Sequence, residues 1–342
     1  METGKKRLVY CRNGVLHVDG RAREVVEAAL NALLSELLRQ DEPDMSFGDF
    51  CRRVIGDSGR AGSTKKDLAS TLGCLEAFQS GYSWDDISYV FVQKFERWLV
   101  ARGYAPNTVT KHMRNLRTLI NEAVRAGYLQ EGDNPFKLIR LAAHKAQHRF
   151  LSPEDLGRME GLCVSGRLGH TRDAFLFCCY TGLRYSDFRR LDAGCLFTEE
   201  GLTWLRMKLK KTGTEIAVPI SLTFGGKAMG VLARYESVEA FARVGSNSRV
   251  NSDLKTLQQL AGIRTRITFH TSRHTCATLL CHQGVPITTV QKILGHTSVS
   301  TTQIYQDVMR DTIVCDLRRI DGRNAAAPPS MCKQVNRSHL RP

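Results

Sequence analysis

The chain has 342 residues, which is long enough for two domains of ordinary size. Its 49 Lys and Arg residues outnumber 34 Asp and Glu residues, and the formal charge of +15 favours a polyanionic partner. There is no apolar run long enough to span a membrane, and the first residues lack the apolar core of a signal peptide, so we expect a cytoplasmic protein. The 11 scattered cysteines are therefore expected to be reduced thiols, several of them in the core.

Residues 1–45 are predicted to form a short N-terminal segment, with an extended stretch (LVYCRNGVLHV) followed by a helix. Apolar residues at three- and four-residue spacing indicate the helix, namely Val26, Leu30, Leu33, Leu34, Leu37 and Leu38. A piece of this size buries little apolar surface alone. We expect it either to pack on a neighbour or to act as an arm, and the sequence does not decide between the two.

Residues 46–140 show the apolar periodicity of a helix bundle. One helix is predicted to begin at Ser63 or Thr64, and the next to run from Asp85 until Gly103 ends it. The last helix is predicted to begin at PNTVT with Asn107 as its cap and to stop at a glycine. The inward-facing residues of these helices are Leu68, Leu72, Leu75, Phe78, Phe91, Phe95, Leu99, Val109, Met113, Leu116 and Ile120.

The last helix of the bundle is predicted to carry Thr110, Lys111, Arg114 and Arg117 on its outer face. From residue 102 to 149 there are nine Lys and Arg and three Asp and Glu, a local excess of six positive charges. A solvated helix face is the usual fate of such a run. Because the excess continues into the following segment, we favour phosphate binding here.

Residues 141–150 are predicted to be a linker, because NPF breaks the preceding helix and LAAHKAQHR is polar and basic. The second domain is predicted to span 151–318 and to open with SPED, in which Ser152 caps a new helix. The remaining tail, 319–342, is biased in composition and is expected to be disordered.

The clearest strand pattern of the second domain is TWLRMKLKKTGTEIAVPI. Its apolar residues alternate with basic ones before the turn KTGT, and apolar residues alternate again on the return. The pattern predicts a hairpin with a lysine at its tip. The alternating residues are Leu205, Met207 and Leu209, with Arg206, Lys208 and Lys210 between them, and then Ile216, Val218 and Ile220.

Six residues of the second domain together suggest one chemistry. A tyrosine phenol keeps its proton at neutral pH because its pKa is about 10. It can attack a phosphodiester only where neighbouring groups take that proton and cations stabilise the phosphorane. The segments TGLRYSDF, KKTGT, HTSRH, LGH and TTQIYQ supply such groups. The candidate residues are Arg184, Lys211, His270, Arg273, His296 and Tyr305.

Each of these residues taken singly also has an ordinary structural interpretation. Arg184 could pair with Asp187 on a helix. PITTVQKILGH is predicted to be a short helix that ends at Gly295, and His296 could cap its C-terminus. Tyr305 could pack in an amphipathic helix capped by Ser298 or Ser300. His270 and Arg273 are three apart at a helix start capped by Thr268 or Thr271, so both can reach one ligand. His274, next to Arg273, is expected to point elsewhere on that helix and to serve packing or support. Cys276, Cys281 and His282 fit no complete set of zinc ligands, so core packing is expected there.

The ordered set of motifs resembles the tyrosine recombinase (phage integrase) family. TGLR-x-x-[DE], K-T-G on a hairpin, H-x-x-R, and L-G-H with a tyrosine nine residues on follow one another over roughly residues 46–318. The resemblance implies a mainly α fold with a small β-sheet. It implies a helical, SAM-like core-binding domain at 46–140 and a mixed α+β catalytic domain at 151–318.

The resemblance also implies roles for the candidate residues. Arg184 and Arg273 would hold the scissile phosphate, supported by Asp187, where the family more often has Glu. Lys211 would protonate the leaving 5′-oxygen, with Lys210 as the adjacent alternative. His270 would be the proton-transfer partner, His296 would hydrogen-bond a nonbridging oxygen, and Tyr305 would form the 3′-phosphotyrosyl link. DNA contacts are expected from Thr110, Lys111, Arg114, Arg117, Lys208 and Lys210.

The implied activity is site-specific recombination of double-stranded DNA, as in the integrase of a mobile element. It is expected to need no cofactor and no ATP, because the phosphotyrosyl bond conserves the phosphodiester energy, and no metal, because arginines do what divalent ions do elsewhere. A homotetramer would exchange strands through a Holliday junction, with the helix from Val308 to Leu317 docking on a neighbouring subunit and an accessory DNA-bending or directionality factor as a further partner. Two alternatives are a type IB topoisomerase and a non-catalytic DNA-binding regulator, in which QKILGHTSVSTTQIY would be a helix-turn-helix.

Overall fold

The computed structural model describes residues 9–12, 15–18, 26–27, 29–30, 45–141 and 148–305. The chain divides into two compact units, Met1–Ala146 and Gln147–Pro342, and each is considered by itself. At the start of the first unit β1 (Val9–Arg12) pairs with β2 (Val15–Val18) as an antiparallel hairpin. Much of the predicted N-terminal helix, with Leu33, Leu34, Leu37 and Leu38, lies outside the described residues, as do residues 142–147 and everything after residue 305.

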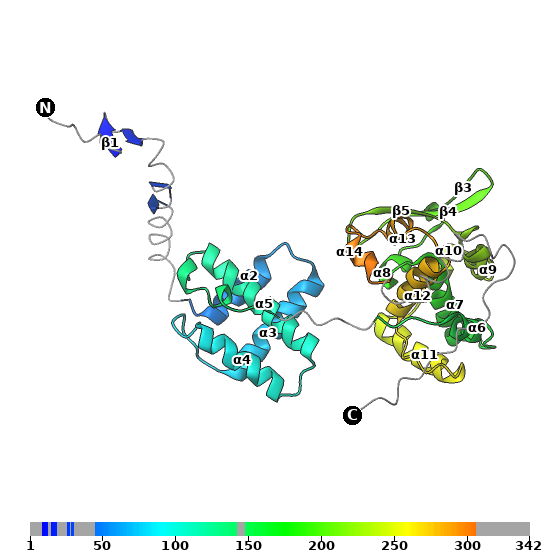
Figure 1. Ribbon diagram of the computed structural model, residues 1–342, viewed down its shortest axis with the longest axis horizontal. Coiled ribbons are helices and arrows are strands. Elements are labelled where there is room, and N and C mark those ends of the chain that lie inside the picture. The colour runs from blue at the N-terminus through cyan, green and yellow to red at the C-terminus, as the bar shows by residue number, and fades with distance from the viewer. Residues whose placement is uncertain are drawn as a thin grey trace, which may run out of the picture. The chain divides into compact units, whose positions relative to one another are not determined.

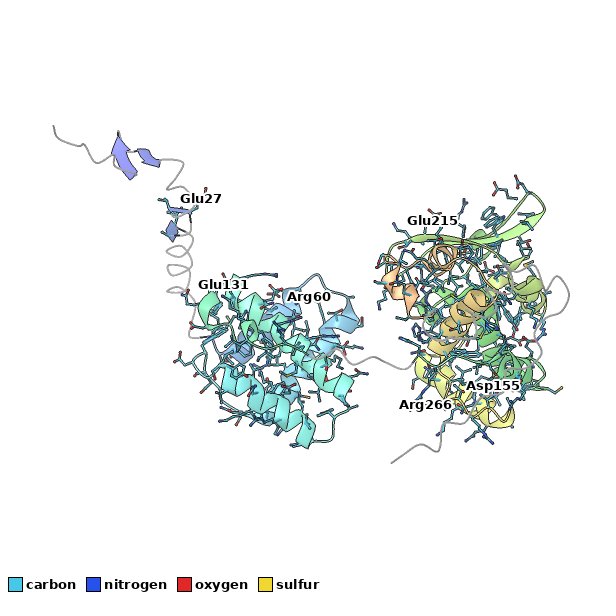
Figure 2. The ribbon with its side chains drawn as sticks, viewed as in Figure 1. Glu27, Arg60, Glu131, Asp155, Glu215 and Arg266 are labelled. Atoms are coloured by element: carbon cyan, nitrogen blue, oxygen red, sulfur yellow. The ribbon has the colours of Figure 1, made fainter. Side chains whose placement is uncertain are left out.

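The remainder of the first unit is a helix bundle around an apolar core, as predicted (Figure 1). Helix α5 lies against α2, α3 and α4, and its inward residues include Met113 and Leu116, both fully buried. Arg60, labelled in Figure 2, joins the loop after α2 to α5 through an ion pair with Glu122 at 2.5 Å. The elements are α2 (Phe47–Asp57), α3 (Gly62–Phe78), α4 (Tyr89–Ala101), α5 (Pro106–Arg125) and the short turns η1 (Glu131–Asp133) and η2 (Pro135–Lys137).

The predicted cap of α5 is wrong, and α3 begins one residue before its predicted start. Asn107 does not cap α5, because that helix already begins one residue earlier at a proline, whose fixed φ suits the first helical position. Ser63 and Thr64 do not begin α3, because the helix already starts at Gly62. Ser88, which the sequence did not single out, caps α4 by accepting a hydrogen bond from the Phe91 backbone N–H at 3.3 Å.

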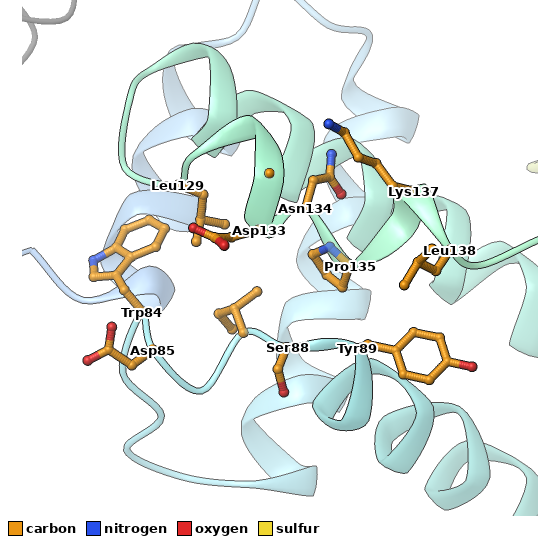
Figure 3. A pocket seen from close by; sticks show the side chains of 12 residues that line it. Trp84, Asp85, Ser88, Tyr89, Leu129, Asp133, Asn134, Pro135, Lys137 and Leu138 are labelled. Atoms are coloured by element: carbon orange, nitrogen blue, oxygen red, sulfur yellow. The ribbon is translucent and has the colours of Figure 1, made fainter.

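A hollow of about 490 Å³ lies in the first unit, between the start of α4 and the turns η1 and η2. Trp84 and Leu138 lie towards opposite ends of it (Figure 3). Its wall carries Asp85, Asp133 and Lys137 among apolar and amide side chains. The candidate residues for phosphoryl transfer do not line this hollow; they belong to the second unit.

In the second unit α7 and α12 pack against each other through the middle, with the sheet on one side and α11 on another (Figure 1). The core is rich in aromatic rings, including Phe175, Phe188 and Phe269. Ser152 caps the first helix, α6, through the Asp155 backbone N–H at 3.1 Å, which confirms the predicted start. The helices are α6 (Pro153–Glu160), α7 (Gly166–Thr181), α8 (Tyr185–Phe188), α9 (Lys227–Leu232), α10 (Val238–Ala242), α11 (Asn247–Leu260), α12 (Phe269–His282), α13 (Ile287–Leu294) and α14 (Ser300–Gln303), with turns η3 (Ala193–Cys195) and η4 (Thr223–Gly226).

The predicted hairpin is present as β4 (Leu202–Lys208) and β5 (Glu215–Pro219), antiparallel, with Leu205 opposite Val218. A third strand, β3 (Leu196–Glu199), pairs with β4 on its other side. The sequence did not predict β3, because four residues of mixed polarity carry no clear alternation. None of the helices within the described ranges is both long and apolar enough to cross a membrane.

Candidate active site

Helix α12 carries three residues that bear on the site. Its start is fixed by the Thr271 hydroxyl, which accepts a hydrogen bond from the Thr268 backbone N–H at 3.0 Å. Of the predicted pair one turn apart, His270 is exposed, whereas Arg273 is 2% exposed. His274 is half-buried and its ring lies edge-on to that of His270, with centroids 4.6 Å apart. The expected role of His274, packing or support away from Arg273, agrees with this place on the His270 face, because residues four apart share a helix face.

Arg273 is held by the ends of two other helices. Its Nη1 donates to the Gly182 carbonyl at 2.8 Å, and its Nη2 donates to the Leu294 carbonyl at 2.6 Å. These carbonyls lie at the C-terminal ends of α7 and α13, where a cation is favourable. Burial, with the charge of Arg184 adding to it, lowers the pKa of Arg273 to about 10, so the guanidinium stays charged at neutral pH.

Arg184 lies in the turn between α7 and α8 and is less firmly held. Its buried Nη1 has no hydrogen-bond partner within the described part of the chain, and the Asp187 Oδ2 atom 3.9 Å away has none there either. Burial lowers the pKa of Arg184, and the charge of Asp187 opposes that shift. A buried guanidinium nitrogen without an acceptor is a group that can bind an anion.

Tyr305 follows α14 and is 3% exposed, packed against Cys276, Leu280 and Leu294. Its hydroxyl is 2.9 Å from Nδ1 of His274, which is hydrogen-bonding distance. Burial raises the pKa of Tyr305, whereas the nearby guanidinium charges lower it. A serine cap was predicted before this tyrosine; α14 in fact has Val299 as its N-cap, without a side-chain bond.

His296 leaves α13 just after Gly295, which has a left-handed φ of 61° as the predicted helix end requires. Its Nδ1 lies 2.9 Å from the Thr302 hydroxyl, and its ring is parallel to that of Tyr305, with centroids 6.5 Å apart. The Thr302 contact therefore fixes the imidazole beside the phenol. A histidine that only capped the helix C-terminus would need neither the Thr302 contact nor the Tyr305 contact.

Lys211 lies in the exposed turn between β4 and β5, as predicted for a hairpin tip. The backbone N–H of its neighbour Lys210 donates to Asp187 Oδ1 at 2.8 Å. Asp187 is fully buried, so this bond ties the hairpin to the turn that carries Arg184. The sequence did not predict this hydrogen bond from Lys210 to Asp187, although it predicted that Asp187 lies beside Arg184.

The three histidines near the phenol, His270, His274 and His296, all have lowered pKa values. Loss of water lowers the pKa of His270 and of His296 to about 4 and that of His274 to about 3. The charges of Arg273 and Arg184 add to the shifts of His270 and His296. The imidazoles are therefore neutral at neutral pH and can accept protons. No group of three or more His, Cys, Asp or Glu residues in the described ranges is arranged to hold a metal ion.

Comparison with protein families matches residues 46–143 to the Phage integrase SAM-like domain and residues 159–311 to the Phage integrase family. The tyrosine recombinase XerD of Oceanobacillus iheyensis is 27% identical over 266 residues, covering 72% of this chain and 87% of that protein. The chain belongs to the phage integrase family of tyrosine recombinases. The tyrosine recombinase XerC of Thermodesulfovibrio yellowstonii is 26% identical over 246 residues, covering 66% of this chain and 79% of that protein.

Solved structures show that this phage integrase family member has the fold of lambda integrase. A lambda integrase tetramer bound to a Holliday junction has a TM-score of 0.63 at 18% identity, covering 87% of this chain and 94% of that chain. XerH recombinase bound to a palindromic difH substrate has a TM-score of 0.58 at 16% identity, covering 81% and 95%. The predicted fold class, mainly α with a small β-sheet and a helical domain before the catalytic one, is confirmed.

The second unit of this tyrosine recombinase brings the predicted catalytic residues together. Arg184 and His270 line one hollow of about 410 Å³, and the charge of Lys211 acts on His270. Two contacts were not predicted from the sequence, that of His274 with the phenol and those of the His148 ring. His274 hydrogen-bonds the phenol, and the ring of His148 lies 4.9 Å from that of His274 and 6.2 Å from that of Tyr305. Spacing gave no signal for either contact, because 31 residues separate His274 from the tyrosine.

The predicted DNA-binding face of α5 is only partly as expected. Arg114 and Arg117 are exposed, and Lys111 is half-buried, pairing with Asp67 at 3.2 Å. Thr110 is 9% exposed, so its predicted place on the outer face is wrong. It lies beside the buried stripe of the helix, where a small side chain packs. Lys208 and Lys210, on the hairpin of the second unit, are exposed.

Proposed function

We propose that this tyrosine recombinase cleaves DNA through Tyr305, whose phenol oxygen attacks the scissile phosphorus and displaces the 5′-oxygen. The observation that carries the proposal is the surrounding of that phenol. Neutral imidazoles lie at hydrogen-bonding or stacking distance from it, and the charges of Arg273 and Arg184 act on it. The resulting 3′-phosphotyrosyl bond retains the energy of the phosphodiester, so a 5′-hydroxyl can reverse the step to rejoin the strand.

The arginines are proposed to hold the phosphate in two different ways. Arg184 offers a buried nitrogen without a partner in the described residues, so it can take a nonbridging oxygen directly. Arg273 supplies a fixed charge, because two backbone carbonyls already hold its terminal nitrogens. Transition-state charge is stabilised most by groups that need no reorganisation. Asp187 is proposed to support Arg184.

The other groups are proposed to act around the phosphate. His296 hydrogen-bonds a nonbridging oxygen, and Lys211, from its exposed turn, protonates the leaving 5′-oxygen, with Lys210 as the neighbouring alternative. His270 faces the hollow shared with Arg184, so we place it at the phosphate. His270 was expected to take the tyrosine proton, but the phenol's hydrogen bond runs to His274.

The substrate is proposed to be double-stranded DNA held by a homotetramer that exchanges strands through a Holliday junction, acting in the cytoplasm. The lambda integrase tetramer on a Holliday junction and XerH on its difH substrate support this, since their folds match. We propose a core-binding domain at 46–140, with Arg114, Arg117 and Lys111 near phosphates, and a catalytic domain at 151–318 with Lys208 and Lys210 on the DNA. The linker at 141–150, the docking helix from Val308 to Leu317 and the disordered tail at 319–342 remain predictions.

Covalent trapping tests the function and requires no chosen target site. Cells expressing the wild type or Tyr305→Phe are lysed in denaturant, protein-bound DNA is recovered, and its ends are sequenced. Ends that accumulate at one locus for the wild type alone establish cleavage by Tyr305 and reveal the site. Equal, empty recoveries from two proteins that both retain DNA binding would contradict cleavage and favour a non-catalytic regulator.

A further inference from the structure

We propose that His274, and not His270, takes the proton of Tyr305 during cleavage, and that His148 holds the His274 ring in place. This inference rests on the proposed function and adds two residues to it. His274 Nδ1 and the Tyr305 hydroxyl are 2.9 Å apart, so the contact exists before DNA binds. His270 is on the same helix face but is exposed, towards the hollow it shares with Arg184.

The proton transfer follows from the hydrogen bond. As the phenol oxygen forms its bond to phosphorus, its proton passes to Nδ1 of His274, and the ring becomes an imidazolium. The bond from phosphorus to the 5′-oxygen breaks, and Lys211 supplies the proton that this oxygen needs. In rejoining, the attacking 5′-hydroxyl gives its proton back to the Lys211 amine and the imidazolium returns its proton to the departing phenol oxygen, so protons balance in both directions.

The electrostatics of His274 suit a group that charges only when DNA is bound. Burial and the neighbouring positive groups lower its pKa to about 3, which keeps it neutral in the free protein. At neutral pH, where His270 and His296 are neutral, the Arg273 guanidinium is a charge that opposes its protonation. A phosphate bound to the arginines offsets that charge, and an opposite charge nearby favours the charged form. Substrate would therefore strengthen the base at the moment it is needed.

His148 belongs to the segment that leads into the catalytic unit and makes its contacts by ring packing. Its ring centroid is 4.9 Å from that of His274, at an interplanar angle of 55°. It is also 6.2 Å from the ring of Tyr305. His270 packs on His274 at 4.6 Å, edge-on. The imidazole that bonds the phenol is thus positioned by rings from its own helix and from the entering segment.

Fluorine NMR tests the contact without DNA. The protein is labelled with 3-fluorotyrosine, and the Tyr305 resonance is the one of nine that Tyr305→Phe removes. His274→Gln should move this resonance further than any other tyrosine resonance. His282→Gln, the same substitution at the end of the same helix, is the matched control and should leave it in place. An unmoved Tyr305 resonance in His274→Gln would overturn the contact.

A second experiment tests the role. The substrate is a duplex of the site recovered by covalent trapping, with the bridging 5′-oxygen either normal or replaced by sulfur, which leaves without needing a proton. On the oxygen substrate both His274→Gln and Lys211→Ala should lose about 10²- to 10⁴-fold in cleavage rate. Sulfur should restore Lys211→Ala and leave His274→Gln slow, since only the first has lost the acid.

The outcomes distinguish a failure of the proton-acceptor role of His274 from a failure of the proposed recombinase function. A His274→Gln enzyme that cleaves at the wild-type rate, or that sulfur restores, overturns the proton-acceptor role. So does an unrestored loss found in His270→Gln alone. If the wild type cleaves neither substrate, the recombinase function fails, while the fluorine measurement still decides whether His274 bonds the phenol.

The positioning role of His148 has its own readout. His148→Phe keeps a ring beside His274 and should cleave within about threefold of the wild type, whereas His148→Ala should be slower and should shift the Tyr305 fluorine resonance. Equal rates for the phenylalanine and alanine variants, with no change of that resonance, would overturn the role. His148 makes no proton transfer in this scheme, so neither variant should respond to the sulfur substrate.

Discussion

The two arginines of the site are held differently, and this predicts a larger loss of stability for Arg273→Ala than for Arg184→Ala, although both variants should lose cleavage. Arg273 satisfies the Gly182 and Leu294 carbonyls, so Arg273→Ala leaves two backbone acceptors without their donor. The free energy of unfolding should fall by about 1–3 kcal/mol or more, since an unmet buried group is costly. Arg184 Nη1 makes no hydrogen bond in the described chain and lies 3.9 Å from Asp187 Oδ2, so Arg184→Ala should lower the free energy of unfolding in urea by less.

Cleavage rates report the catalytic roles of the two arginines, apart from their effects on stability. Arg184→Ala should lower covalent cleavage by about 10²- to 10³-fold, the usual cost of one donor to transition-state charge. Arg273→Ala should be at least as slow, and its loss of stability should be visible in the same preparation. An Arg184→Ala protein destabilised as strongly as Arg273→Ala would mean that the pairing of Arg184 with Asp187 matters as much for folding as the two carbonyl bonds of Arg273.

Asp187 makes a testable link between Arg184 and the hairpin. Its Oδ1 accepts the Lys210 backbone N–H, so Asp187→Ala should release the turn that carries Lys211. Cleavage should drop by up to about 10²-fold, because a displacement of about 1 Å can cost that much. Hydrogen exchange of the Lys210 amide should accelerate. Asp187→Asn keeps the acceptor oxygen and is the matched control; equal amide exchange in the two variants would contradict the link.

At the scale of elements, the end of α13 is pressed against the sheet. Gly295 has a φ of 61°, and a Cβ there would lie 2.4 Å from Leu209 Cδ1 and 2.8 Å from Ile216 Cγ2. Gly295→Ala should therefore cost about 1–2 kcal/mol for the left-handed backbone and about 1–3 kcal/mol for overpacking. It should also displace His296, the next residue, and slow cleavage.

Gly262 provides the matched control for this substitution. It has a similar φ of 62°, yet a Cβ there would meet nothing within 4 Å. Gly262→Ala should thus show the backbone cost alone in urea unfolding. Equal losses of unfolding free energy for the two alanine variants would show that the sheet yields to the added methyl group and that the close approach is unimportant.

Sequence patterns predicted elements better than contacts between them. The alternation of Leu205, Met207 and Leu209 indicated β4 because a half-buried strand requires it, and the helix before Gly295 followed from a glycine at its end. The bond from His274 to Tyr305 had no such signal. It depends on how α12 and the end of α14 pack, which local periodicity does not encode.

At the scale of the whole molecule, the lowered pKa values of the site histidines predict a pH dependence of stability. In the folded chain His270 and His296 bind a proton only near pH 4 and His274 near pH 3, whereas unfolded histidine binds one near pH 6.5. Between these values the unfolded state takes up more protons. The free energy of unfolding should therefore fall as pH decreases from about 6.5 towards 4.

Urea midpoints measured from pH 7.5 to 4.5 check this expectation. The wild type should lose on the order of a few kcal/mol across the range, with partial exposure of His270 reducing its share. His274→Gln should give a flatter profile, because one titrating ring is gone. Parallel profiles for the two proteins would show that His274 has an ordinary pKa in the folded state.

The near-complete burial of Tyr305 has a consequence for the genome that carries this chain. A nucleophile that is 3% exposed and already bonded to an imidazole is shielded from passing phosphodiesters and from reagents that nitrate or iodinate phenols. Cutting would then demand that the side chains covering the phenol move aside when a duplex arrives, while the bond to His274 is kept. An enzyme able to break chromosomes would therefore stay inactive until it binds its site, and nitration of Tyr305 would report when the phenol becomes accessible.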